Sequence, residues 1–531
     1  MSCHFQAQDA RHARFDVSRQ ATRRTYTEFA NPSLQCDGVQ PVCQRCLKAR
    51  RSCYGMNTGR TGSVVHIENS YASGQKKRPR GPRPNPTVEL VGTLDSPSVI
   101  LPNPPVDLKT QAIMYYTHYH LQTLKDAQSI SRGIIDDFLP IWTSRAQCPI
   151  LDLALSSMAL AVFSRTQQHP LAAIEASAKY HQLLQTAQTT IPSLNEGNVN
   201  VCLLAIFFMG RYEDAIHRPS HLIRSSPSLL TFQSFSHHDG ALAILEIWKD
   251  RLSHTQPATD VVKHTRRGLI RSALLRNLVL PNWILEGASF GERGLELEYD
   301  RIVVRTLNAR HRLSTLLKEK TQLHRISHDF IDIAEELNQD LRDTDKALRD
   351  WTVHIPRTWS FQRHTLADTD PWPTKDFYSP TVCSYTSPGH AAVWHHYHAM
   401  RLLINSTRLR ALKLRLPSSD DFANEPLLEC LSNIRAIASD LASSVPFCLE
   451  KFRVATVPKS SCHQKTITLN TTGDIKPPMA SLIVWPITIA SSLEDVDFKQ
   501  RLWFRSQIAR IGRILGVGVF ESAETDPWLE L

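Results

Sequence analysis

Apolar residues recur at three- to four-residue spacing along most of the chain after residue 110, with polar and charged residues between them. This is the period of an α-helix that buries one face. Alternation of apolar and polar residues, which would indicate strands, is rare. The pattern predicts a large all-α domain over residues 111–531, and hence a mostly α chain. Five stretches show it most clearly: residues 150–163, 241–252, 307–348, 389–416 and 499–516.

Two segments interrupt the helical pattern. Residues 372–389 and 456–478 are rich in proline, serine and threonine and have no helical period, which predicts loops. The longest apolar run, residues 201–209, is about half the length of the roughly 18 residues that a membrane span requires. This run therefore predicts a buried helix, and we expect no membrane partner.

The composition changes between residues 56 and 110, where glycine, proline, serine and asparagine are frequent. Repeated prolines fix φ and remove backbone donors, so we expect an extended linker. A short basic cluster within it is typical of a nuclear-localisation signal, and a merely solvated linker is the alternative. The cluster consists of Lys76, Lys77, Arg78, Arg80 and Arg83.

The chain has the composition of an ordinary soluble globular protein, with 42% apolar and 21% charged residues, but its charge is uneven. Residues 1–85 hold 15 lysines and arginines against 5 aspartates and glutamates, whereas the remaining 446 residues hold 46 of each sign. The whole formal charge of +10 therefore lies in the first sixth of the chain. A basic segment on a neutral body indicates a polyanionic partner, and a solvated tail is the alternative.

Four of the eleven cysteines lie within 18 residues, at Cys36, Cys43, Cys46 and Cys53. The N-terminus lacks the apolar stretch of a secretory signal, so we expect a reducing compartment, where clustered cysteines are metal ligands more often than disulfides. The C-x2-C pair directs two thiolates toward one tetrahedral zinc ion, whose charge offsets their repulsion. A redox pair would need a neighbouring βαβ pattern, which the sequence lacks. The spacing predicts a zinc site.

This spacing resembles the second half of the fungal zinc binuclear cluster, in which six cysteines hold two zinc ions. Cys36 corresponds to the family's third cysteine, and Cys43, Cys46 and Cys53 correspond to its last three. The resemblance implies a zinc-dependent regulator in the nucleus that binds double-stranded DNA containing CGG triplets. It also implies control of RNA polymerase II genes, with those of a metabolic gene cluster as an expectation.

Basic residues between and beside the last cysteines are those expected to contact DNA phosphates, which position a protein on the duplex. They are Arg45, Lys48, Arg50 and Arg51. The family reads bases with a helix between its second and third cysteines. The expectation for this chain is therefore a cluster that docks on DNA without its base-reading residues.

The first half of the family's pattern is absent. Tyr26 and Phe29 stand where the pattern has cysteines, and residues 30–35 contain no lysine or arginine. Three explanations stay open: the first half is encoded upstream of a wrongly assigned start, the protein has lost it and acts as a co-regulator or interaction module, or another ligand completes a single-zinc site. Candidates for that ligand are Cys3, His4 and His12. We expect two zinc ions in an intact cluster and one or none in the chain as written.

The helical body resembles the regulatory region of the same family through degenerate helix patterns. These patterns occur, in the family's order, at residues 237–252, 266–285, 391–404 and 479–523. We therefore expect four segments: an unpatterned N-terminus (1–35), a partial zinc cluster (36–55), a basic proline-rich linker (56–110) and an all-α regulatory domain (111–531).

The resemblance also bears on partners. Family members often dimerise through heptads after the cluster, but residues 56–105 are too rich in proline for heptads. A homodimer through the helical body and a monomer are both open. Residues 524–531 combine acidic and bulky side chains, and we favour a frayed end over a contact with the transcription machinery.

The chain contains none of the short motifs of common enzyme classes, so we expect no enzyme. Histidines cluster at residues 237–238 and 390–398. His395 and His398 have the spacing of helical metal ligands, but no carboxylate follows before Asp420, which favours core or surface histidines. The segment LGVGVF at residues 515–520 follows a helical pattern and is not a nucleotide-binding loop.

Overall fold

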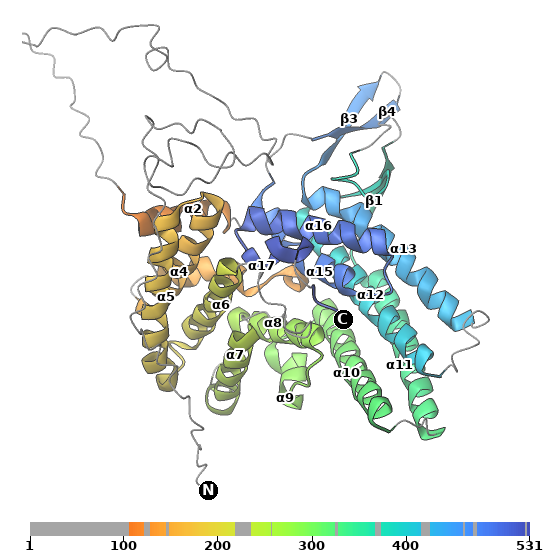
Figure 1. Ribbon diagram of the computed structural model, residues 1–531, viewed down its shortest axis with the longest axis horizontal. Helices are drawn as coiled ribbons and strands as arrows, with labels where there is room; N and C mark the ends of the chain where they lie inside the picture. Colours follow the sequence, from red (N-terminus) through yellow and green to blue (C-terminus); the bar gives the residue numbers. More distant parts are fainter. Residues whose placement is uncertain are drawn as a thin grey trace, which may run out of the picture. The chain divides into compact units, whose positions relative to one another are not determined.

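The computed structural model describes residues 106–531, apart from gaps at residues 122–127, 145–147, 218–234, 256, 324–327, 367–372, 416–424, 460–461, 471–474 and 526–527. The described residues belong to one unit of the chain, Leu101–Leu531. Helices make up 77% of the described part, so the prediction of a mostly α fold is confirmed there (Figure 1). Residues 1–105, with the predicted zinc cluster and most of the predicted linker, lie outside it.

The N-terminal part of the described domain is built around α4 (Pro149–Thr166). This helix packs against α2 (Leu108–Tyr119), α5 (Pro170–Thr190) and α6 (Val199–Ile216) (Figure 1). Eleven residues of α4 are buried, including a continuous run from Ala154 to Val162, which is typical of a helix surrounded by others. The helices predicted at residues 150–163 and 201–209 are both confirmed.

The middle of the domain contains α7 (Phe235–Ile247) and α8 (Asp260–Arg276), with a π-helical turn at Trp248–Leu252 between them. Thr259 caps α8, since its hydroxyl accepts a hydrogen bond from the Val262 N–H at 3.3 Å. The helix ends at Asn277, which adopts the left-handed conformation. α8 packs against α6, α7 and α10 (Gly294–Leu323).

The C-terminal part is built around α12 (Pro388–Arg415), which packs against α10, α11 (His328–Trp351) and α13 (Glu425–Cys448) (Figure 1). The helix predicted at residues 389–416 is confirmed as far as the described residues reach. The helical region predicted at residues 307–348 is divided between α10 and α11, which pack against each other.

Two β-hairpins correct the prediction of an all-α domain. β1 (Phe361–Thr365) pairs antiparallel with β2 (Thr381–Tyr385), and β3 (Phe452–Lys459) pairs antiparallel with β4 (Cys462–Leu469). The prediction of loops at residues 372–389 and 456–478 was therefore wrong for β2, for part of β3 and for β4. Threonine and valine, which favour strands, are frequent in β3 and β4, but proline and glycine nearby hid this signal.

The hairpins share a small core of their own. Leu366, Phe377, Val382 and Phe452 are buried together, away from the main core of the helices. Phe452 stands opposite Leu469 in the β3–β4 register, so the strand ends nearest α13 close this core. Tertiary packing against apolar neighbours is what stabilises such short strands.

The C-terminal helices return to the N-terminal half. α15 (Val484–Ser492) packs on α12, α16 (Phe498–Leu515) packs on α4 and α15, and α17 (Gly518–Glu521) packs on α6 and α16. The helix predicted at residues 499–516 is confirmed as α16. Short helical elements complete the described part: α3 (Phe138–Ser144), α9 (Asn282–Leu285), α14 (Pro477–Ser481), and 3-10 turns at Ser129–Ser131, Ile134–Asp137, Ile191–Ser193, Gly287–Phe290, Thr352–His354, Arg357–Trp359 and Ser522–Glu524.

The predicted frayed end is wrong. The Trp528 indole N–H donates to the Ser491 hydroxyl at 2.9 Å, and the Leu531 N–H donates to the Ser492 carbonyl at 3.0 Å. Both side chains are buried against the end of α15. Burial of two large apolar side chains outweighs the fraying expected from the acidic residues nearby.

The segment LGVGVF is a tight turn between two packed helices. Gly516 ends α16 with φ 67°, a conformation that glycine adopts without steric cost. Gly518 begins α17 against the end of α6, where a Cβ would lie 2.2 Å from the His217 carbonyl oxygen. The glycines therefore allow a close approach of two helices.

Gly518→Ala is expected to destabilise the domain by about 1–3 kcal/mol, because the added methyl group must displace the α6 backbone. The measurement is the free energy of unfolding in urea. Gly268→Ala in α8 is the matched control, since a Cβ there has no neighbour within 4 Å and alanine stabilises helix interiors by about 0.5–1 kcal/mol. Equal stabilities for the two variants would contradict the close approach at Gly518.

Candidate functional site

The residues predicted from sequence to bind zinc and DNA lie outside the described part of the chain. These are Cys36, Cys43, Cys46 and Cys53 for zinc, and Arg45, Lys48, Arg50 and Arg51 for DNA. The basic cluster from Lys76 to Arg83 also lies outside it. The structure does not test these assignments, which stay predictions.

The cysteines of the helical domain have the character of core residues. Cys202, Cys383, Cys430 and Cys448 are buried, and all are free thiols. Burial raises the pKa of Cys202, Cys383 and Cys430 to about 11, so these thiols stay protonated and unreactive at neutral pH.

The histidines of α12 are also core residues, one of the two placements that the sequence favoured. His390, His395, His396 and His398 are all buried. The His395 Nε2 atom lies 2.5 Å from the Ser444 hydroxyl, and the His390 Nδ1 atom lies 2.7 Å from the Thr386 hydroxyl. Among the residues that the structure describes, no group of three histidines, cysteines or carboxylates is placed to hold a metal ion.

A buried network of ion pairs joins α8 to α10. Arg266 is fully buried, and its guanidinium donates to both carboxylate oxygens of Asp300 at 2.7 and 2.9 Å. It also donates to the carbonyls of Ile284 and Leu285, at 2.6 and 3.0 Å. Four of the five N–H donors of this guanidinium are thereby satisfied, and the pair fixes α8 against the start of α10.

A second set of pairs runs along the next face of α8. Arg267 donates to Glu292 at 2.7 Å and to Glu296 at 3.0 Å. Lys263, one turn earlier, lies 2.5 Å from the same Glu296 carboxylate. The two glutamates are thus shared between two cations one helical turn apart.

Arg271 occupies the next position on this face and has no such partner. Within the described residues, no carboxylate oxygen lies within 4.0 Å of its guanidinium, and its single hydrogen bond is a long one, 3.5 Å to the Ile130 carbonyl. Burial lowers the pKa of Arg271 to about 10, so it remains charged at neutral pH. A half-buried cation without a counter-ion is costly and calls for an explanation.

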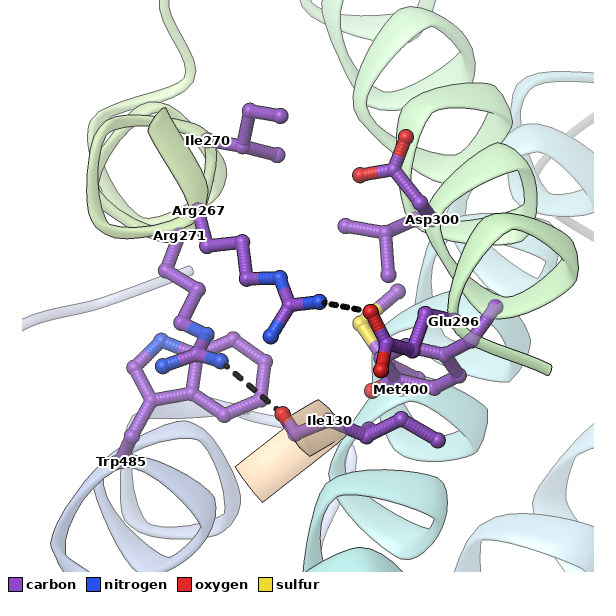
Figure 2. A pocket seen from close by; sticks show the side chains of 10 residues that line it. Ile130, Arg267, Ile270, Arg271, Glu296, Asp300, Met400 and Trp485 are labelled. Atoms are coloured by element: carbon purple, nitrogen blue, oxygen red, sulfur yellow. Dashed lines mark hydrogen bonds and ion pairs between the residues drawn. The ribbon is translucent and has the colours of Figure 1, made fainter. Parts of the chain in front are cut away.

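Arg271 lies in the walls of two cavities. The smaller one, of about 30 Å³, lies between α8, α10, α12 and α15, and is large enough for a water molecule only. Figure 2 shows Arg267, Arg271 and Trp485 on one side of it, facing Glu296 and Asp300 of α10, with Ile130 below.

The larger cavity, of about 330 Å³, lies between α6, α7, α8, α15 and α17. We call it the α6–α8 cavity. Six of its apolar lining residues are Ile134, Leu203, Ile206, Phe207, Leu269 and Leu275. Its charged groups are Arg211 and Arg271 against Asp214, and its size falls in the range of about 300–1,000 Å³ typical of ligand sites.

Three histidines line the α6–α8 cavity. His264 is held by Asp137, with 2.6 Å between Nδ1 and the carboxylate oxygen, and His237 lies 3.0 Å from Glu213. His238 lies 3.0 Å from the Ser272 hydroxyl, and burial together with the charges of Arg276 and Arg211 lowers its pKa to about 4. His238 is therefore neutral at physiological pH, and the permanent positive charge of the cavity comes from its arginines.

The helix pattern expected at residues 266–285 overlaps the second part of α8, Asp260–Arg276, but sequence reasoning did not find the site that this helix carries. Lys263, Arg266, Arg267 and Arg271 place four cations within nine residues of a helix whose other positions are largely apolar and buried. Such a density of charge on a buried helix was the available signal. The positions of the partner carboxylates, 25 to 34 residues away for Arg266 and Arg267, could not be read from it.

No known protein family, curated protein or solved structure matches this chain. None of the helices that the structure describes is both long enough and apolar enough to cross a membrane.

Proposed function

We propose that the protein is a zinc-dependent, DNA-binding regulator of RNA polymerase II transcription that acts in the nucleus. The observation that carries the proposal is the spacing of Cys36, Cys43, Cys46 and Cys53, whose C-x2-C pair directs two thiolates toward one tetrahedral zinc ion. It resembles the second half of the fungal zinc binuclear cluster, and family resemblance names a CGG-containing duplex as the partner.

Two further observations support this proposal. The net charge of +10 lies within residues 1–85, beside the cysteines, where it would attract DNA phosphates. A large, mostly helical domain follows the basic linker, as the resemblance to the family's regulatory region leads one to expect.

A co-regulator or protein-interaction module without DNA binding is the second candidate function. Tyr26 and Phe29 in place of cysteines, and the absence of lysine and arginine from residues 30–35, favour it. Both candidates assign regulation to the helical domain and differ in whether the cysteine segment holds zinc and docks on DNA.

Zinc content and DNA affinity of the full chain distinguish the two candidates. If the chain binds DNA, we expect one zinc ion per chain, measured by atomic emission, and binding to a CGG duplex, measured by fluorescence anisotropy. If Arg45, Lys48, Arg50 and Arg51 each neutralise a phosphate, the logarithm of the affinity falls with the logarithm of salt with a slope of about −3.6.

Substitution of the cysteines tests whether zinc binding and DNA binding depend on the same residues. Cys43→Ser with Cys46→Ser is expected to remove both the zinc and the DNA binding, because too few thiolates remain. Cys148→Ser, a half-buried cysteine of the helical domain, is the control and is expected to retain both. A wild-type chain without zinc and without affinity for the duplex would leave the co-regulator as the function.

A further inference from the structure

We propose that the α6–α8 cavity binds a small apolar carboxylic acid, whose carboxylate is held by Arg271 and the Trp485 indole N–H. The inference rests only on the described helical domain. It therefore stands or falls separately from the zinc and DNA proposal.

The anionic end of the ligand is assigned by Arg271. Its guanidinium faces the cavity and lacks a carboxylate partner among the described residues, although Arg266 and Arg267 of the same helix are fully paired. The side chain is half-buried and borders the open space of both cavities. A ligand carboxylate would supply the missing counter-ion in a water-poor site, where charge-assisted hydrogen bonds are strong.

A second unsatisfied donor lies in the same wall. The Trp485 Nε1 atom is buried and has no hydrogen-bond partner among the described residues. Trp485 and Arg271 both line the small cavity shown in Figure 2, and both also line the α6–α8 cavity. A buried N–H without an acceptor is destabilising, so both groups favour an oxyanion at this end.

The rest of the cavity requires an apolar body. Its other walls are dominated by Leu203, Ile206, Phe207, Leu269 and Leu275, which offer no hydrogen bonds through their side chains. The volume of about 330 Å³ is at the lower end of ligand pockets, so it fits a small molecule and not a peptide or a nucleotide chain.

Gly268 marks open space within the cavity wall. It lies in α8 between Arg267 and Leu269, and a Cβ at this position would have no neighbour within 4 Å. A larger side chain can therefore enter the cavity without a clash in the helix. This position allows the site to be blocked while the fold is kept.

Two carboxylates serve as probes, aromatic 2-naphthoate and aliphatic decanoate, with 2-naphthamide and inorganic phosphate as comparisons. Isothermal titration of the full chain is expected to show one saturable site for at least one carboxylate. The matched amide, which lacks the charge, should bind about 10- to 100-fold more weakly, since hydrogen bonds to charged groups are the stronger ones. Phosphate, which lacks the apolar body, should not bind detectably.

Three variants locate the site. Arg271→Met is expected to weaken carboxylate binding about 10- to 100-fold and to leave amide binding unchanged. Gly268→Leu is expected to abolish binding of both while the melting temperature is kept or raised, because it fills the cavity and removes a helical glycine. Arg276→Met is the control on the same helix, since Arg276 pairs with Asp239 outside the cavity wall and should leave carboxylate affinity unchanged.

The outcomes that overturn the proposal are distinct. If neither carboxylate binds with saturation, the cavity does not bind such a ligand. If a carboxylate binds but Gly268→Leu does not change its affinity, the ligand binds elsewhere. If the acid and the amide bind with equal affinity, Arg271 does not hold a carboxylate. If phosphate binds as tightly as the acid, the apolar wall does not contribute to binding. Should Arg271→Met fail to fold, Gly268→Leu and the acid–amide comparison still decide the question.

Discussion

Acidification to about pH 5 is expected to remove about 4 kcal/mol of folding free energy from the helical domain, because two buried histidines of α12, His395 and His398, gain protons on unfolding. Burial lowers the pKa of His395 and His398 to about 3, and that of His396 well below 6.5. The charges of Arg271 and Arg401 lower the pKa of His396 and His398, respectively, still further.

The direction of the effect follows from proton binding. Between pH 6.5 and the folded pKa values, an unfolded histidine is protonated and the buried one is not, so the unfolded state binds more protons. The contribution of each buried histidine to the free energy of unfolding is therefore largest above pH 6.5. It decreases as the pH falls toward the pKa of that histidine in the folded state. At about pH 5 the contributions of His395 and His398 have each fallen by about 2 kcal/mol, and the total loss approaches the lower end of the stability of a typical domain, about 5–15 kcal/mol.

Urea denaturation at several pH values, followed by circular dichroism, measures this loss. The slope of unfolding free energy against pH should decrease in His395→Gln and His398→Gln, since each variant removes one proton-binding side chain from the unfolded state. His254→Gln, an exposed histidine, is the control and should leave the slope unchanged. A stability that is flat between pH 7 and about pH 5 would contradict the prediction.

Asp300→Asn is expected to destabilise the domain by about 3–5 kcal/mol, because it removes the carboxylate that Arg266 hydrogen-bonds and leaves only Glu292, at 3.9 Å, as a counter-ion for the buried charge. Arg266 has no exposed surface, and both of its contacts with the Asp300 carboxylate are shorter than 3 Å. The amide of asparagine keeps the size of the side chain but can accept only part of these hydrogen bonds.

The matched comparison is Asp340→Asn, which breaks a pair with Arg305 on the surface at 2.9 Å. Both side chains of that pair are more than a third exposed, so water screens them and the expected loss is about 0–1 kcal/mol. The free energy of unfolding in urea measures both. A loss at Asp300 as small as that at Asp340 would mean that water reaches the Arg266 guanidinium.

The helices of this domain were the part most open to prediction. α4, α12 and α16 were each located within a few residues, because an apolar stripe with helical period is a property of the local sequence. The hairpins were missed because their strands are short and are stabilised by distant residues, such as Leu366 and Phe377 packing on Phe452. The packing of the C-terminal residues was missed for the same reason, since the Ser491 hydroxyl accepts a hydrogen bond from the Trp528 indole, 37 residues further along the chain.

The candidate functional features likewise include some that the sequence predicts and some that only the tertiary structure shows. The sequence by itself determined the helices, the basic N-terminal segment and the clustered cysteines, because periodicity, charge and close spacing are all local properties. Only the tertiary structure decided which of the α8 arginines are paired and where the cavity lies. Glu292, Asp300 and Trp485 reach α8 from segments far along the chain, and whether a buried charge has a partner depends on distances that folding alone establishes.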